Sequence, residues 1–211
     1  MPKQLADQKA ALARIQEHLE KSSERVLIGI IGKPGAGKST LSKFLMGKLP
    51  KDLVTVVPMD GYHLSNKVLK DLKRSDRKGA PDTFDVAGFV SLVKRIRSEQ
   101  TQNIYYPIFD RAIEESIAAQ GVVTSATKVV IIEGNYLLHD EGGWEVINDL
   151  LDESWMVDVD DDKRISRLIS RHIAYGKDPE AAKAWAKGTD EVNAKLIERG
   201  RTRADFVVAI D

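Results

Sequence analysis

The sequence predicts an α/β fold with a doubly wound, mostly parallel sheet that carries helices on both faces. Two continuous apolar runs, VLIGIIG at 26–32 and KVVIIEGNYLL at 128–138, are typical of strands buried on both faces. Segments of helical periodicity alternate with these and with shorter apolar runs. Because parallel neighbours need crossover connections, usually helices that pack on the sheet, this alternation indicates a parallel sheet.

The length and composition suit one soluble domain over 1–211. The chain is 42% hydrophobic and 30% charged, which is enough to bury one substantial core. Lys and Arg together number 32, as do Asp and Glu, so no net charge attracts nucleic acid or an anionic membrane. The absence of cysteine excludes disulfides, thiolate metal sites and a cysteine nucleophile. No apolar run approaches the roughly 20 residues that cross a bilayer, so we expect a cytoplasmic protein.

The first elements are expected to form one βαβ unit behind an N-terminal helix. Apolar residues at helical spacing over 4–21 predict an amphipathic helix within residues 1–25, which covers the edge or flank of the sheet. The strand at 26–32 leads through a glycine-rich turn into a helix, and LVTVV at 53–57 returns to strand chemistry.

Residues 60–124 are predicted to form an insertion. The segment 61–83 is polar and partly helical, and 84–98 is a further amphipathic helix. Shorter β segments at 103–109 and 121–126 flank a polar link.

The second half of the chain continues the alternation after the buried strand at 128–138. The expected elements are a helix at 144–151, a strand at 154–160, a helix at 161–176 opened by Asp161 or Asp162, a charged helix at 177–199 and a strand at 205–210.

The stretch GKPGAGKS at 32–39 matches the phosphate-loop pattern G-x-x-x-x-G-K-[ST], directly after a buried strand and directly before a helix. Permissive glycines let several N–H groups turn towards phosphate oxygens at a helix N-terminus. Lys38 is expected to bridge the β and γ phosphates, and Ser39 to place its hydroxyl on Mg²⁺. A glycine-rich turn without a ligand is the alternative, which the flanking elements disfavour. The predicted nucleotide-binding residues are Gly32, Lys33, Pro34, Gly35, Ala36, Gly37, Lys38, Ser39 and Thr40.

Two carboxylates stand at the ends of apolar runs. Glu133 occupies the place of the second acid of a P-loop protein, which holds Mg²⁺ directly or through water; an exposed strand end is the alternative. Asp60 follows the strand after the P-loop helix, at the sheet edge where ligands collect. This position suits a catalytic base that orients the hydroxyl of an acceptor and takes its proton. The alternative is that Asp60 only caps the turn at Gly61.

The sequence lacks the motifs of other classes of P-loop protein. Asn66-Lys67 lacks the acid of a guanine-reading Asn-Lys-x-Asp, and Asp140-x-x-Gly143 falls after the second-acid strand. A nucleic-acid-stimulated ATPase is disfavoured by the charge balance and by the lack of a basic groove interleaved with aromatic residues.

Six motifs resemble the family of phosphoribulokinase, uridine kinase and bacterial pantothenate kinase, in the same order and over about residues 26 to 210: GKPGAGKST, MDGYHL, RKGAPDTFD, YPIFDR, IIEGNYLL and RLISRH. Within that family the chain is most similar to the bacterial group labelled fructose transport system kinases or nucleoside kinase-like P-loop proteins. The resemblance implies Mg·ATP as phosphoryl donor and a small-molecule alcohol as acceptor. It also implies that 60–124 binds the acceptor and that 161–199 forms a helical lid and the helix that follows it.

The resemblance further implies residue roles. Asp60 becomes the catalytic base, Lys38, Arg167 and Arg171 stabilise the phosphates, and Ser39 and Glu133 hold Mg²⁺. The substrate-binding residues that it implies are Tyr62, His63, Arg77, Lys78, Asp110, Arg111 and Glu133. Asn193 is a further candidate on the helix after the lid, whereas no chemistry is assigned to His18, His139 or His172.

The chain departs from the family at Phe109-Asp110-Arg111. Pantothenate kinases and phosphoribulokinases carry a Ser-His-type sequence there, and uridine kinases place an aromatic residue at the position of Arg111. Sugar, nucleoside and vitamin-like acceptors therefore all stay open. In an Asp-Arg pair the carboxylate suits the hydroxyls of a polyol, and the guanidinium suits a carboxylate or phosphate group of the ligand. The alternative is that the two side chains form a surface salt bridge with each other.

Two interpretations of function follow. The first is an ATP-dependent small-molecule kinase with Asp60 as base, and the second is a nucleotide-binding regulatory protein that keeps the fold without kinase turnover. Neither nucleic acid nor a membrane is an expected partner. The N-terminal helix and the insertion both offer surfaces for a homodimer.

Overall fold

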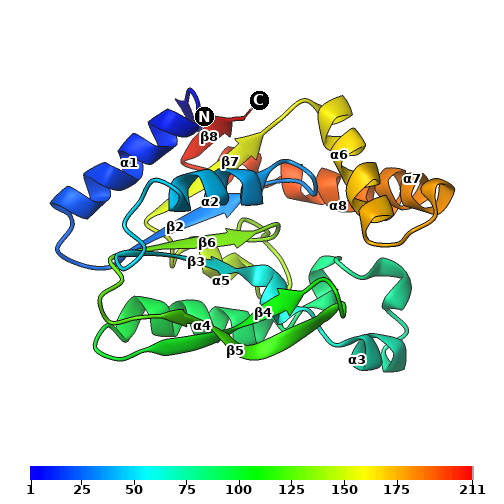
Figure 1. Cartoon of the computed structure of the whole chain (residues 1–211), viewed down its shortest axis with the longest axis horizontal. Helices are drawn as coiled ribbons and strands as arrows, with labels where there is room; N and C mark the ends of the chain where they lie inside the picture. The colour runs from blue at the N-terminus through cyan, green and yellow to red at the C-terminus, as the bar shows by residue number, and fades with distance from the viewer. Residues whose placement is uncertain (211) are drawn as a thin grey trace.

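Six parallel strands form the central sheet of the computed structural model, which describes residues 1–210 (Figure 1). Residue 211, which the predicted domain includes, lies outside the described residues. The order across the sheet is β1-β8-β7-β2-β6-β3, and every neighbouring pair is parallel. The strands are β1 (Lys3–Leu5), β2 (Val26–Ile31), β3 (Val54–Pro58), β6 (Val129–Gly134), β7 (Glu153–Asp158) and β8 (Phe206–Ala209).

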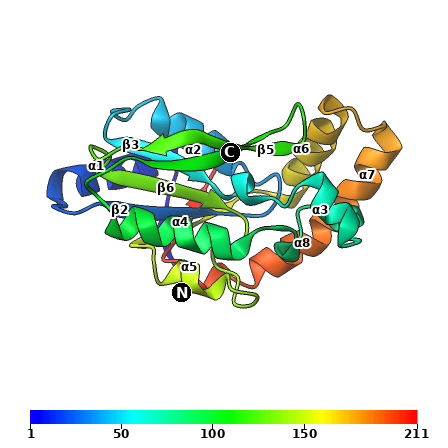
Figure 2. The same cartoon turned by 90° about the horizontal axis from the view of Figure 1, so that it is seen from below.

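Helices cover both faces of this sheet, which confirms the doubly wound fold (Figures 1 and 2). Alternating strand residues point to opposite faces, so β2 sends Ile28 and Ile30 to one core and Leu27 and Ile31 to the other. One face packs on α1 (Gln8–Lys21) and α2 (Lys38–Met46), and the other on α4 (Val86–Ser98), α5 (Glu145–Asn148) and α8 (Thr189–Glu198). No helix among residues 1–210 is both long and apolar enough to span a bilayer.

Helices α3 (Asn66–Asp71), α6 (Asp161–Ala174) and α7 (Pro179–Lys187) gather at the carboxyl ends of the strands. Both views place them at the same end of the molecule (Figures 1 and 2). A two-stranded antiparallel hairpin of β4 (Ile104–Asp110) and β5 (Glu115–Val123) stands apart from the main sheet. Within the segment predicted as an insertion, α4 and the hairpin residues Ile104, Tyr106 and Val123 pack in one core with the sheet.

The hairpin is seated against the turn that follows β3. Tyr106 donates a hydrogen bond from its hydroxyl to the carbonyl of Val56, at 2.8 Å. At Gly61 the two backbones meet so closely that an added Cβ would lie 2.0 Å from the carbonyl oxygen of Pro107. A glycine is therefore required beside Asp60 for the hairpin to approach.

The close approach at Gly61 gives a stability prediction. Gly61→Ala is expected to lower the free energy of unfolding by about 1–3 kcal/mol, because backbone must move to admit the methyl group. Urea denaturation checks this value. Gly47→Ala is the matched control: Gly47 has φ −72° and its Cβ position lies no closer than 3.4 Å to another atom, so this variant should be neutral or slightly stabilised. Equal stability of the two variants would contradict the close approach.

Several element boundaries differ from those expected. The predicted helix at 4–21 begins only at residue 8, because residues 3–5 form the edge strand β1 beside β8. A three-residue edge strand is too short to show the alternation that identifies strands. The charged helix at 177–199 is two helices, α7 and α8, interrupted at Gly188, which has φ −100° and ψ −95°.

Other boundaries move by a few residues. Asp160 caps α6, in place of Asp161 or Asp162, because its extended backbone lets its carboxylate accept from the amides of residues 162 and 163. The strand at 128–138 ends at Gly134, the helix at 144–151 covers only 145–148, and β5 begins at Glu115 in the polar link.

Candidate active site

The phosphate loop lies between the buried strand β2 and helix α2, as the motif requires. Gly35 and Gly37 have φ of +79° and +95°, a region that side chains with a Cβ rarely adopt. A Cβ on Gly35 would also lie 2.7 Å from the carbonyl oxygen of Arg164 on α6. Lys33 forms an ion pair with Asp161 at 2.9 Å, so the loop lies against the start of helix α6.

Lys38 folds back over this loop. Its ammonium donates to the carbonyl of Gly32 at 2.9 Å and to Oδ1 of Asn135 at 2.6 Å. Burial lowers the pKa of Lys38 to about 8, although the carboxylates of Glu133 and Asp60 act in the opposite direction. Keeping the ammonium of Lys38 charged therefore costs free energy until an anion binds beside it.

The lowered pKa of Lys38 predicts that the protein takes up a proton when ATP binds. Phosphate oxygens favour the ammonium form, so ATP binding near pH 8 should raise the pKa of Lys38 and draw a proton from solvent. Affinity for ATP should fall as the pH rises above about 8, by up to about tenfold per pH unit. Calorimetric titration in buffers of different ionisation enthalpy measures both effects.

The control for this titration is the exposed Lys48, just beyond α2. Lys38→Met should abolish the uptake that Lys48→Met retains. Undiminished uptake in Lys38→Met would assign the proton to another group.

Oxygen donors suited to Mg²⁺ lie beside the loop. The Ser39 hydroxyl donates to Oε1 of Glu133 at 2.6 Å, and the Ser42 hydroxyl donates to Oε2 at 2.8 Å. The pairing of β6 with β2 and β3 places Glu133 next to the strand that enters the loop. Within residues 1–210 no cluster of three or more His, Asp or Glu side chains could hold a metal alone. One hydroxyl and one carboxylate fit Mg²⁺, which takes its remaining ligands from phosphates and water.

Asp60 faces this centre from the 3₁₀ turn Met59–Tyr62 after β3. Its carboxylate is 35% exposed and forms an ion pair with Arg111 at 2.8 Å. Burial alone would raise the pKa of Asp60, but His63, Arg111, Lys38 and Arg171 together outweigh it and lower the pKa. The carboxylate is therefore ionised at neutral pH.

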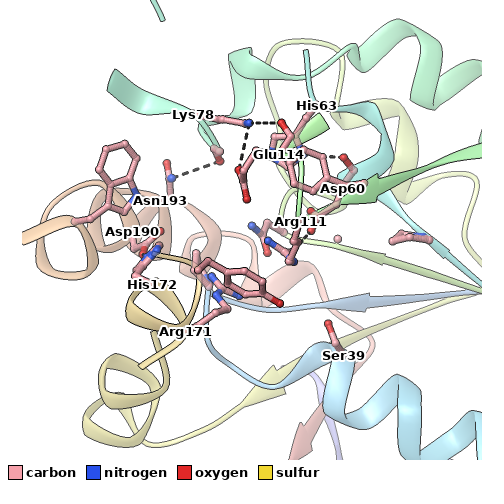
Figure 3. A pocket seen from close by; sticks show the side chains of 18 of the residues that line it. Ser39, Asp60, His63, Lys78, Arg111, Glu114, Arg171, His172, Asp190 and Asn193 are labelled. Carbon is pink, nitrogen blue, oxygen red and sulfur yellow. Dashed lines mark hydrogen bonds and ion pairs between the residues drawn. The ribbon is translucent and has the colours of Figure 1, made fainter. Parts of the chain in front are cut away.

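A cavity of about 450 Å³ joins these groups (Figure 3). Its walls come from the P-loop, the turn after β3, the hairpin and helices α6, α7 and α8, and its polar lining includes Lys38, Asp60, Lys78, Arg111, Arg171 and Asp190. A neighbouring cavity of about 910 Å³ is lined by α2 and β4 and shares Lys38, Ser39, Asp60, Glu133 and Arg111 with the first. Thr40 and Gly37 line the larger cavity, and Pro34 the smaller one.

Helix α6 contributes two arginines from successive turns. Arg171 lines both cavities, and burial followed by repulsion from Arg111 lowers its pKa. Across residues 1–210 its guanidinium has no hydrogen bond or ion pair. Arg167 lines the larger cavity, and one of its guanidinium nitrogens lies 3.5 Å from the Cβ position of Gly37.

Three residues predicted to bind the acceptor do not line either cavity. Tyr62 packs edge-on against Phe89 with 5.3 Å between ring centroids. Arg77 forms an ion pair with Asp82 at 2.8 Å. The Asp110 carboxylate accepts from the amide of residue 112 in the hairpin turn, at 2.8 Å. Asp110 and Arg111 therefore do not act as one pair, since the partner of Arg111 is Asp60.

Two lining residues form a pair that the sequence did not predict. His172, to which no chemistry was assigned, lies on α6 at 2.7 Å from the carboxylate of Asp190 on α8; these side chains are 15% and 11% exposed (Figure 3). Asn135, the partner of Lys38, directly follows the Glu133-Gly134 end of β6. Its position in the motif EGN was the available signal, whereas contact between α6 and α8 left no trace in the sequence.

Comparisons with known proteins find relatives along nearly the whole chain. The model of the Phosphoribulokinase / Uridine kinase family matches residues 27–210. A crystal structure described as a "putative fructose transport system kinase" from Silicibacter sp. TM1040 is 39% identical. The superposition covers 95% of this chain and 98% of that one, with a TM-score of 0.85.

Two further relatives are more distant. A Schizosaccharomyces pombe protein named "Putative uridine kinase" is 32% identical over 203 residues, which cover 90% of this chain and 85% of that protein. The crystal structure of YFH7 from Saccharomyces cerevisiae shares the fold at 19% identity, with a TM-score of 0.81 over 97% of this chain and 99% of that one.

Proposed function

Because the chain belongs to the phosphoribulokinase/uridine kinase family of P-loop kinases, we propose that it transfers the γ-phosphoryl group of ATP to an alcohol of a small sugar, nucleoside or vitamin-like acceptor. One observation carries this proposal. Asp60 lines the same cavity as the P-loop residues Lys38 and Ser39 and the lid residue Arg171. A base, phosphate-binding cations and a closing helix thus face one space, as transfer between two bound substrates requires.

The nucleotide is proposed to bind through residues 32–40, with the γ-phosphate near Lys38. Loop amides at the N-terminus of α2 favour phosphate, and Lys38 exchanges its carbonyl and amide partners for phosphate oxygens. Ser39 and Glu133 would hold Mg²⁺, which neutralises phosphate charge when bound.

Asp60 is proposed to orient the acceptor hydroxyl. The acceptor oxygen forms a bond to the γ-phosphorus while the bond from phosphorus to the bridging oxygen of ADP breaks. The hydroxyl proton passes to Asp60, which later returns it to solvent. The ion pair with Arg111 keeps Asp60 ionised and aimed, which suits a loose transition state in which positioning matters more than base strength.

Arg171 is proposed to stabilise charge that develops on the transferring phosphoryl group. Its guanidinium lines both cavities, so it can reach donor and acceptor together. Closure of α6 over both substrates would also exclude water, which competes with the acceptor.

The test offers the purified protein Mg·ATP with pools of nucleosides, ketoses, aldoses, vitamin alcohols and sugar acids, and detects phosphorylated products by mass. The names of the relatives make fructose and uridine obvious members. A product in one pool supports the kinase. Tight binding of ATP without product or ADP from any pool would favour a regulatory protein instead.

A further inference from the structure

We propose that His172 and Asp190 are positioning residues for the kinase reaction. Their contact fixes the second half of α6 on α8 and so aims Arg171 at the phosphoryl group that is transferred. This inference rests on the proposed function, in which Arg171 stabilises that group. It adds two residues that act through Arg171 and not by touching the substrates.

The guanidinium of Arg171 has no partner that holds it in place. It lines both cavities, and across residues 1–210 it makes no hydrogen bond or ion pair. Burial and then repulsion from Arg111 lower its pKa, whereas attraction to Asp190 and Asp60 acts in the opposite direction. The direction of the Arg171 side chain therefore depends on where the backbone of α6 lies at residue 171.

The first half of α6 is held firmly. Arg164 is 1% exposed and forms ion pairs with Asp161 at 2.8 Å and with Glu191 of α8 at 2.6 Å. Leu168 is fully buried, and its Cγ lies 2.8 Å from the Cβ position of Gly35 in the P-loop. This part of the helix is thus fixed against both the P-loop and α8.

The second half of α6 is packed far less. No residue over 169–174 is buried, and Ile173 is 42% exposed. A helical segment without buried side chains gains little from tertiary packing, so it opens more easily than the rest of the helix. In the described part of the chain, the contact of His172 with Asp190 is the only side-chain hydrogen bond or ion pair made by residues 169–174 (Figure 3). This contact therefore decides how well the segment around Arg171 is held.

Helix α8 is a rigid support for this contact. Its residues Ala194 and Ile197 are buried, and Ile197 belongs to the core that covers the sheet. The amide of Asn193 donates to the carbonyl of Gly79 at 3.4 Å, which ties α8 to the segment before α4 as well. Asp190 thus lies on an element that the core of the protein keeps in place.

The acids at the start of α8 do more than complement the helix dipole. Asp190 and Glu191 occupy its first turn, where any carboxylate is favoured. Both carboxylates nevertheless contact side chains of α6, at Arg164 and His172, which lie about two turns apart. Arg171 lies between these two points. Adjacent acids on one helix therefore hold the other helix at both ends of the segment that carries Arg171.

The kinetic test combines Asp190→Ala with Arg171→Gln. Asp190→Ala alone should lower kcat by about 10- to 100-fold, the cost of a misplaced catalytic group, with little change in KM for ATP or the acceptor. In the Arg171→Gln background the same substitution should change kcat by less than about twofold, because the pair acts through Arg171. His172→Leu should behave like Asp190→Ala. Glu180→Ala, which removes an exposed carboxylate from the first turn of α7, is the control that leaves kcat unchanged.

Hydrogen exchange tests the same contact without turnover. Peptides that cover 169–174 should exchange about fivefold faster or more in Asp190→Ala and His172→Leu, as the loss of one hydrogen bond allows. Asp190→Asn keeps an oxygen acceptor for His172 and should exchange like the parent chain. Peptides from β2 should exchange equally in every variant, which shows that the fold is retained. Unchanged exchange over 169–174 would overturn the inference whether or not the chain is a kinase.

The kinetic outcomes separate the inference from the proposed function. Faster exchange together with the kcat of the parent chain would make the contact purely structural and overturn the inference. A fall in kcat that is equally large with and without the Arg171 side chain, or a rise in KM for the acceptor alone, would make Asp190 a substrate ligand instead. Both results leave the kinase standing. Absence of product from every acceptor in the parent chain, with ATP still bound, would overturn the kinase and the inference together.

Discussion

Replacing Asp60 by asparagine is expected to lower kcat by about 10²- to 10⁴-fold, the usual contribution of a positioned base. The variant keeps the shape of the side chain but loses the proton acceptor and the ion pair with Arg111. ATP binding should change little, because the phosphate contacts come from the P-loop. Initial rates and ATP titrations on the same preparation separate the two effects.

A matched control for this substitution is Asp76→Asn. Asp76 is an exposed carboxylate in the same segment, so its loss should leave kcat unchanged. If Asp60→Asn turned over at the rate of Asp76→Asn, Asp60 would be a structural turn residue and the base would have to be sought elsewhere.

Arg171→Gln is expected to lower kcat by about 10³-fold or more, with a much smaller effect on KM for ATP. Arginines that stabilise a transferring phosphoryl group contribute at this level, because they act on charge that is strongest in the transition state. Arg171 suits this role because it lines both cavities and its guanidinium has no hydrogen-bond partner in residues 1–210. Steady-state kinetics with the acceptor saturating measures the loss.

Lys163→Gln removes a cation from the same helix at an exposed position and is the control. It should leave kcat near the parent value, since its charge faces solvent. A rise in KM for ATP with unchanged kcat in Arg171→Gln would mean that Arg171 binds ground-state ATP and does not act in the transition state.

Much of the fold was predictable because its strongest signals are local. The buried runs at β2 and β6 and the glycine-rich turn between β2 and α2 are contiguous stretches whose chemistry specifies their structure. The strand β1 depends instead on its pairing with β8 at the other end of the sequence. Such pairing overrides local pattern, and a single sequence does not display it.

The site divides in the same way. The P-loop follows the end of β2 and Glu133 lies near the end of the neighbouring strand β6, so the structure brings Ser39 and Glu133 into contact. The side-chain pairings could not be read from spacing. Arg111 reaches Asp60 across 51 residues, and His172 reaches Asp190 from another helix. Because Asp110 and Arg111 are adjacent in the sequence, they were considered as a pair. In the structure the Asp110 carboxylate accepts from the amide of residue 112 in the hairpin turn instead.

The most direct test of the account is a balance on the γ-phosphoryl group of ATP. ADP, inorganic phosphate and phosphorylated alcohol are quantified together by mass, with the acceptor pools and with the acceptor that they identify. The account predicts one phosphorylated alcohol for each ADP, little free phosphate, and loss of both products in Asp60→Asn. ADP formed with an equal amount of inorganic phosphate, or ATP bound without any ADP, would contradict it.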